Sequence, residues 1–287
     1  MPQQKLALVL GGGGNLGVVQ VAFIEALAER GVRPDLVVGT SVGSLNAAYV
    51  AFQDPKRNQE PLGEIWVGLR GQRLLHRNAF RIVRRLFRNR LSLYSDQFVT
   101  NLVRDHLDAD DFANARIPLL ITATNLSSGE PAVLSEGSVQ QAILASTAIP
   151  GIFPPVEIDD DWYVDGGVAY GLGVEAAVDH GATSVLTVDL SSGMAYRQPR
   201  GLVDVLARSY AIMGQRRTTC LLEHSGLVAK ITVWRPGLTA PHGPGSFDDM
   251  ELLLSQAREL AGPLIDLSLN DDGTFAAGVY EGSVRRR

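Results

Sequence analysis

A serine between two glycines near the start of the chain is the strongest candidate for covalent chemistry. Residues 39–43, Gly-Thr-Ser-Val-Gly, match the G-x-S-x-G pattern with Ser41 at its centre. Between a buried strand and a helix, this pattern places the serine on a tight turn with its hydroxyl exposed. The apolar run Leu36–Val38 precedes it, and 44–52 has a helical pattern. We therefore predict that Ser41 is a nucleophile for acyl transfer; the alternative is an ordinary glycine-bounded turn.

An earlier glycine-rich stretch offers backbone N–H donors. Gly12, Gly13 and Gly14 follow the apolar run Lys5–Leu10 and precede a helical pattern. Free N–H groups at a helix N-terminus bind anions, and they would stabilise the oxyanion that forms when a serine attacks a carbonyl. The stretch also fits the dinucleotide-binding pattern G-x-G-x-x-G, which needs an acidic residue at the end of the second strand. Asp35 stands before that strand instead, so we favour the oxyanion hole.

A serine nucleophile needs a nearby base to accept its proton. The pattern does not fit an α/β-hydrolase, because the serine turn ends only the second strand and not a later one. No recognisable constellation contains any of the five histidines, His76, His106, His180, His224 and His242. Asp165 follows the apolar run 162–164 and precedes Gly166 and Gly167. A carboxylate within hydrogen-bond reach of the hydroxyl can act as general base; the alternative is that Asp-Gly-Gly is only a turn.

The elements that must position these residues alternate between strand and helix. We expect strands at 5–10, 36–38, 118–124, 162–164, 184–190 and 229–234, the last of these being the last core strand. Helices are expected at 18–30, 44–52, 64–69, 98–106, 138–146, 175–180, 202–215 and 248–260. Strand–helix alternation predicts a parallel sheet, whose strands end at a common edge. The two glycine-rich turns should meet there.

Composition excludes several classes of function. The 287 residues are 45% hydrophobic and 20% charged, and the net charge of −5 gives no general attraction to nucleic acid. One cysteine, Cys220, excludes an intrachain disulfide framework. The apolar run near the N-terminus is too short for a signal peptide or a transmembrane helix. We expect a cytoplasmic protein without cofactor or metal; Asp159–Asp161 lacks the spacing of a calcium loop and is predicted to be a turn.

One segment carries a local excess of positive charge. Within Arg77–Arg90, apolar residues recur at helical spacing while arginines occupy most other positions. A basic amphipathic helix can lie on an anionic membrane, which would make the protein peripheral. The alternative is a surface helix whose apolar side packs on the domain.

Taken together, these motifs resemble the patatin-like phospholipase family. The resemblance rests on the triple glycine, the Gly-Thr-Ser-Val-Gly-Ser run and Asp-Gly-Gly, in this order and spacing. The stretches 145–156 and 187–190 support it, and it covers roughly 6–52 and 117–190.

The resemblance implies a three-layer α/β/α sandwich with a mostly parallel central sheet. It implies a lipid acyl hydrolase in which Ser41 is the nucleophile, Asp165 the base, and an acyl-enzyme the intermediate. The oxyanion hole would be formed by Gly12, Gly13 and Gly14, with support from Gly39, Gly43, Gly166 and Gly167. We expect a single domain over 1–287, with a variable helical cap at about 53–112 and a C-terminal helical extension at about 246–287.

Two departures from the family pattern leave alternatives open. The family usually has Arg or Lys where Leu16 stands, and often has Asn-x-Pro in place of part of 168–173. Besides a lipid hydrolase, the sequence therefore allows a short-chain esterase or thioesterase, or a lipid-binding protein with weak turnover. The sequence does not predict the head group, the chain length or the oligomeric state.

Overall fold

The computed structural model describes residues 5–54, 59–72, 91–107, 110–191, 198, 202–224, 229–242 and 245–282. The basic segment Arg77–Arg90 lies outside the described residues, so its two interpretations stay as predictions. Among the described residues, no helix has both the length and the apolar character needed to cross a membrane.

The described strands form one sheet in the order β5-β6-β3-β2-β1-β7-β8-β9, with β4 paired to β3. The six strands β3-β2-β1-β7-β8-β9 pair in parallel with one another. At the other end of the sheet, β4 and β6 pair antiparallel with β3, and β5 pairs antiparallel with β6. Their bounds are β1 Leu6–Leu10, β2 Leu36–Thr40, β3 Leu119–Asn125, β4 Pro131–Leu134, β5 Val156–Ile158, β6 Asp161–Asp165, β7 Ser184–Val188, β8 Lys230–Arg235 and β9 Gly278–Glu281.

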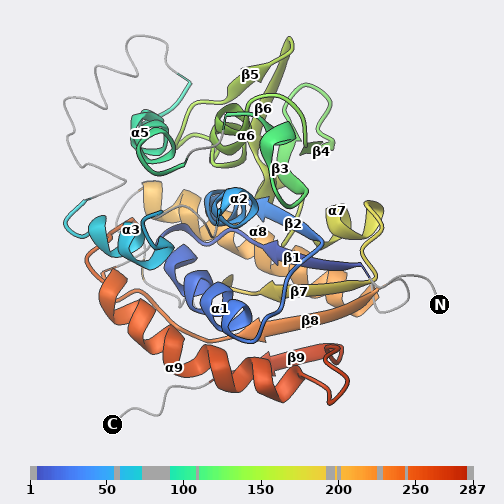
Figure 1. The fold of residues 1–287 in the computed structure, drawn as a ribbon. Helices are drawn as coiled ribbons and strands as arrows, with labels where there is room; N and C mark the ends of the chain where they lie inside the picture. The colour runs from blue at the N-terminus through green and yellow to red at the C-terminus, as the bar shows by residue number, and fades with distance from the viewer. Residues whose placement is uncertain are drawn as a thin grey trace.

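Helices cover both faces of the sheet. They are α1 Gly17–Glu29, α2 Val42–Phe52, α3 Leu62–Gly68, α5 Gln97–His106, α6 Val139–Ser146, α7 Val174–Asp179, α8 Leu202–His224 and α9 Met250–Ser268. Single 3-10 turns occur at η1 Gly14–Leu16, η2 Phe112–Asn114 and η3 Gly166–Val168. Figure 1 shows α1 and α9 in front of the sheet and α8 behind it, which gives the predicted three layers.

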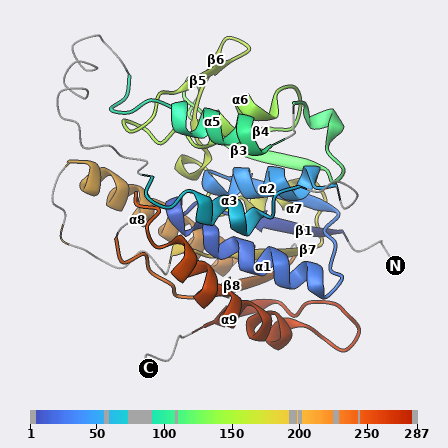
Figure 2. The same ribbon diagram turned by 60° about the vertical axis from the view of Figure 1, so that its left-hand side comes forward.

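The central strands are apolar because both of their faces are covered. Every residue of β2 and β7 is buried, as expected for parallel strands between two helical layers. One apolar cluster joins the sheet to α1, α2 and α9, and a second joins the opposite face to α7. Figure 2 shows α9 running alongside α1, and Arg258 of α9 pairs with Glu25 of α1 at 2.8 Å.

The register of the central strands positions the site. β1 pairs with β2 so that Leu10 lies opposite Gly39. The glycine loop that follows β1 therefore starts beside the serine turn that follows β2. This is the common strand edge where open α/β sheets bind their ligands.

The C-terminal part of the chain differs from the prediction. The strand predicted at 229–234 is β8, but an unpredicted strand, the mostly exposed β9, pairs in parallel with it at the edge of the sheet. The segment expected as a helical extension therefore contributes an edge strand as well as α9. Likewise, α8 continues to His224, beyond the predicted end at 215.

The predicted turn at Asp159–Asp161 closes a hairpin. Ile158 of β5 pairs with Asp161 of β6, and the two residues between them have positive φ, 50° at Asp159 and 66° at Asp160. A two-residue turn with both φ values positive matches the right-handed twist of the strands it joins, and aspartate tolerates this conformation. The prediction of a turn is confirmed.

Candidate active site

Ser41 stands on a sharp turn between β2 and α2. Its φ of 53° and ψ of −129° lie where L-residues are rarely found. A Cβ on Gly43 would lie 1.9 Å from the carbonyl oxygen of Leu10, and one on Gly39 would lie 2.5 Å from the Cα of Ser44. Both glycines are therefore needed for the backbone to pack around the serine.

Hydrogen bonds with two further serines hold this turn. The Ser41 N–H donates to Ser146 Oγ at 2.8 Å, and Ser44 Oγ donates to the Ser41 carbonyl at 2.6 Å. Because Ser146 ends α6, it connects the serine turn to this helix, which packs against β5 and β6. Strain at one residue persists only where its surroundings fix it in this way.

Asp165 is the last residue of β6 and is completely buried. Its N–H donates to the Ala148 carbonyl at 3.0 Å, and its own carbonyl accepts from Thr124 Oγ1 at 3.0 Å. In the side chain, Oδ1 accepts from the Gly167 N–H at 2.9 Å and from the Tyr210 hydroxyl at 2.5 Å. Oδ2 is buried and has no hydrogen bond of standard geometry in the part of the chain that the structure describes.

Burial raises the pKa of Asp165 from 3.8 to about 6, against the opposing effect of hydrogen bonds from Ser41, Tyr210 and the Gly167 N–H. The Ser41 hydroxyl is thus close enough to interact with the carboxylate. Catalytic hydrogen bonds are often long or misaligned before substrate binds. The structure therefore brings together the two residues predicted as nucleophile and base.

The glycine loop is packed too closely for side chains. A Cβ on Gly12 would lie 3.1 Å from the Cβ of Ser41 and 3.7 Å from its Oγ. One on Gly13 would lie 2.6 Å from Leu190 Cδ1, and Gly14 has a φ of 59°. Of the three predicted oxyanion-hole residues, Gly12 is the one for which the structure shows a close approach to Ser41.

A buried polar network holds the base of this loop. Gln20 Nε2 donates to the Gly11 carbonyl at 2.8 Å. Asn46 Nδ2 donates to Gln20 Oε1 at 2.8 Å, and Trp66 Nε1 donates to Asn46 Oδ1 at 2.9 Å. A peptide unit is planar and trans, so fixing the Gly11 carbonyl also fixes the direction of the Gly12 N–H. This network was not predicted, although Gln20 and Asn46 stand out in the sequence as polar residues inside apolar helices.

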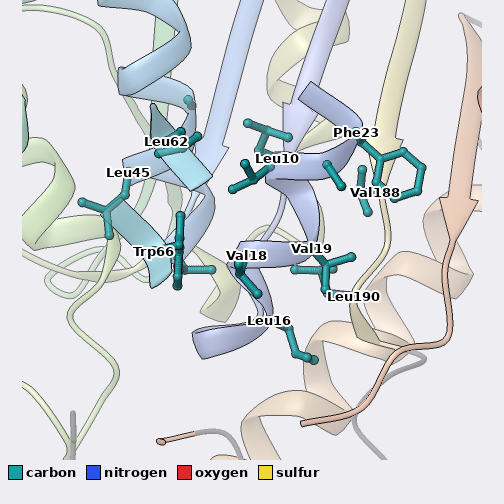
Figure 3. Close-up of a cluster of buried hydrophobic side chains, with 14 of the residues drawn as sticks. Leu10, Leu16, Val18, Val19, Phe23, Leu45, Leu62, Trp66, Val188 and Leu190 are labelled. Carbon is teal, nitrogen blue, oxygen red and sulfur yellow. The ribbon is translucent and has the colours of Figure 1, made fainter. Parts of the chain in front are cut away.

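Leu16, which departs from the family pattern, is not exposed at the site. Its side chain is 4% exposed and belongs to the apolar cluster that also contains Val18 and Leu190 (Figure 3). The loop of this protein therefore has apolar packing where the family usually has a basic residue.

Asp165 has a hydrogen-bond partner, Tyr210, that was not predicted from the sequence. Tyr210 comes from α8, and its hydroxyl reaches the carboxylate past Gly167, where a Cβ would lie 2.4 Å from that hydroxyl. A Cβ on Gly166 would lie 2.4 Å from Thr122 Oγ1. The two glycines after Asp165 thus make room for α8 and for β3. No local pattern around Tyr210 marks it.

The histidines whose side chains are described form hydrogen bonds away from Ser41 and Asp165. His106 contacts Glu60 at 3.0 Å, His242 contacts Asp249 at 2.6 Å, and His180 contacts the carbonyl of its own helix at Ala176 at 2.7 Å. No hydrogen bond among the described residues joins any of them to Ser41 or Asp165. No group of three or more metal-binding side chains is found in that part of the chain either.

Comparison with known proteins places this chain in a family. The family model of the patatin-like phospholipases matches residues 8–178, more than half of the chain. The chain belongs to the patatin-like phospholipase family. The matched region includes the glycine loop, the serine turn and the Asp-Gly-Gly motif.

Curated relatives in this family are much longer proteins. Lysophospholipase nte1 of Aspergillus terreus is 26% identical over 84% of this chain and 14% of its own length. Patatin-like phospholipase domain-containing protein 7 of Mus musculus is 27% identical over 65% of this chain and also 14% of its own length. This patatin-like chain thus spans about a seventh of these relatives. VipD from Legionella pneumophila aligns with 93% of this chain and 67% of its own, at 14% identity and a TM-score of 0.42.

Proposed function

We propose that this patatin-like protein is a carboxylic ester hydrolase that acts on lipid acyl esters. The observation that supports it most directly is a buried carboxylate, Asp165, beside a serine on a strained turn. Oδ2 is buried and has no standard hydrogen bond within the described ranges, so it is free to accept a proton. The lysophospholipase names of the relatives support lipids as the substrate class.

The proposed reaction runs in two halves through an acyl-enzyme. Asp165 accepts the proton of the Ser41 hydroxyl as Oγ attacks the ester carbonyl. The N–H groups of Gly12, Gly13 and Gly14 stabilise the oxyanion. When the tetrahedral intermediate collapses, the carbon–oxygen bond breaks and the leaving alcohol takes the proton from Asp165. Water then attacks the acyl-serine with Asp165 again as base, which releases the fatty acid and restores Ser41.

The raised pKa of Asp165 suits this role. With a pKa of about 6, the carboxylate is mostly ionised at neutral pH yet is a stronger base than an exposed aspartate. General bases work best when their pKa lies near the working pH. Activity that depends on this base should therefore fall as the pH drops below about 6.

Hydrolysis of lysophosphatidylcholine micelles, followed as fatty acid release, tests the proposal. Wild type should turn over, while Ser41→Ala and Asp165→Asn should each lose at least about 100-fold in kcat, the usual contribution of such groups. Matched controls are Ser128→Ala and Asp160→Asn, which make the same chemical changes in exposed turns. Equal activity of wild type and both site variants would refute the proposal. Turnover of short soluble p-nitrophenyl esters but not of lysolipid would replace lipid by small esters as the substrate class.

A further inference from the structure

The two oxygens of the Asp165 carboxylate are in different surroundings. Oδ1 receives two donors, the Gly167 N–H at 2.9 Å and the Tyr210 hydroxyl at 2.5 Å. Oδ2 has no standard hydrogen bond among the described residues. A carboxylate held at one oxygen by two donors from different directions cannot rotate freely, so the identity of the free oxygen is fixed. That oxygen is the one left to receive a proton.

The two donors come from different parts of the fold. Gly167 belongs to the same turn as Asp165, and its N–H is a local contact. Tyr210 belongs to α8, in the layer behind the sheet (Figure 1), and lies 45 residues away along the chain. The same helix has a second contact with this turn, because the Arg217 guanidinium donates to the Ala169 carbonyl. Thus α8 is attached beside the carboxylate at two points.

The tyrosine can donate over the whole working pH range. Burial, together with the negative charge of Asp165, raises the pKa of Tyr210 well above 10. The hydroxyl therefore keeps its proton and must be the donor whenever Asp165 is ionised. Its hydrogen bond stabilises the carboxylate form, which is why it acts against burial and lowers the pKa of Asp165.

We propose that Tyr210 is a positioning residue for the general base: its hydroxyl holds Oδ1 of Asp165 so that Oδ2 faces Ser41. This inference rests on the proposed function, because it takes Asp165 to be the base. It extends the Ser41–Asp165 pair to a third side chain that the family motifs do not contain.

Few charged or titratable groups face Asp165. Among the described residues, the groups that act on the carboxylate are the Ser41 hydroxyl before α2, the Tyr210 hydroxyl of α8 and, as a backbone donor, the Gly167 N–H of η3. The charge of Arg217 acts on Tyr210 and opposes the larger effects of burial and Asp165 that raise the pKa of this tyrosine. A shift in the titration of Asp165 after a change at Tyr210 can therefore be assigned to the lost hydrogen bond.

The test is the pH dependence of kcat/KM for Tyr210→Phe on lysophosphatidylcholine micelles. The variant keeps the ring but removes the hydroxyl, so Asp165 loses a donor and its pKa rises. A hydrogen bond to a charged group is strong enough to move the acid limb upward by about one to two pH units. We also expect kcat to fall by about 10- to 100-fold at neutral pH because the base is less well oriented, with KM nearly unchanged and partial recovery at high pH.

Two further variants separate positioning from general damage. Gly167→Ala keeps the N–H but places a methyl group where the tyrosine hydroxyl now lies, so it should shift the acid limb in the same direction. The double variant Gly167→Ala with Tyr210→Phe should be no worse than the stronger single one, since both remove the same contact. Tyr280→Phe is the matched control. The hydroxyl of Tyr280, which lies on β9, donates to the Ala276 carbonyl at 3.3 Å, and the pH profile of this variant should equal that of wild type.

The outcomes also distinguish this inference from the proposed function. If Ser41→Ala and Asp165→Asn abolish activity but Tyr210→Phe has the acid limb of wild type, Tyr210 has no positioning role and the dyad stands. A uniform loss at every pH without a shift would likewise refute the inference. If wild type itself is inactive and does not depend on Ser41, the proposed function fails first. Should Tyr210→Phe not fold, an unshifted profile of Gly167→Ala would still contradict the inference.

Discussion

At the scale of single residues, Asp165 shows a conflict between function and stability. A carboxylate without full hydrogen bonding is costly to bury in its charged form, and burial raises the pKa of this one from 3.8 to about 6. The folded state therefore binds this proton more tightly than the unfolded state. Its contribution to stability is fully present below pH 3.8 and is lost as the pH rises through about 6.

Asp165→Asn should therefore stabilise the protein at alkaline pH while removing activity. A rise of about two pKa units, at about 1.4 kcal/mol each, corresponds to about 3 kcal/mol in the free energy of unfolding. Chemical denaturation at pH 8 should show the variant to be more stable by up to this amount, and the gain should disappear at pH 4. A variant that is less stable than wild type at both pH values would contradict the burial of an ionised carboxylate.

The site residues differ in how far the sequence could indicate them. Ser41 and Asp165 stand in motifs whose spacing is visible in the chain, so they could be predicted, although their catalytic roles stay predictions. Tyr210 could not, because its contact with Asp165 spans 45 residues and joins two layers of the fold. Gln20 stands out in the sequence as a polar residue within an apolar helix, but its hydrogen bond to the Gly11 carbonyl is evident only in the folded structure.

At the scale of elements, the strand–turn–helix unit around Ser41 depends on glycine for steric reasons. A Cβ at Gly43 would overlap the Leu10 carbonyl at 1.9 Å, which is backbone and cannot move aside. Gly43→Ala should therefore yield insoluble protein, or soluble protein with a strongly lowered melting temperature and no activity.

The matched control is Gly214→Ala in the interior of α8, where a Cβ meets nothing within 4 Å. There, alanine should raise stability by about 1 kcal/mol, the usual helix preference over glycine. Thermal unfolding of the two variants checks both expectations. If Gly43→Ala unfolded at the wild-type temperature, the packing of the serine turn would be wrong.

The buried network under the glycine loop gives a second prediction at this scale. Gln20→Met should remove the side-chain donor to the Gly11 carbonyl, at a cost of about 1–3 kcal/mol for an unsatisfied buried group. The Asn46 amide would lose its bond to Gln20 but keep its bond to the Gly17 carbonyl at 2.9 Å. Because the Gly12 N–H would lose its fixed direction, kcat should fall by about tenfold or more, less than the full loss of an oxyanion donor. A variant with lowered stability but wild-type kcat would show that the network supports folding only.

At the scale of the whole molecule, the parallel core followed from the alternation of strands and helices, whereas the edges did not. β4 and β5 have four and three residues, too few to show a periodic pattern. β9 is mostly exposed along Gly278–Glu281. A strand without a buried face does not need the alternation of apolar and polar residues by which a strand is predicted. The place of β9 in the sheet comes from α9, which returns the chain beside β8.

This arrangement predicts that the chain cannot fold without its C-terminal part. The large apolar side chains that α9 buries are Met250, Leu253, Leu254, Leu264 and Ile265. Each contributes about 1.5–3 kcal/mol by burial, so together they match the whole stability of a typical domain, about 5–15 kcal/mol. A chain that ends at residue 245 should be insoluble or lack a cooperative thermal transition. A truncated chain that melts like wild type would instead show that α9 and β9 are an appendage.

The most direct test of the Ser41–Asp165 pair is covalent labelling with a fluorophosphonate, mapped by mass spectrometry. A single adduct is predicted on the peptide that contains Ser41, absent from Ser41→Ala and formed at least about 100-fold more slowly in Asp165→Asn, because the base removes the serine proton in the same step. Labelling at another residue, or labelling of Ser41 at an unchanged rate without the Asp165 carboxylate, would contradict the proposed site.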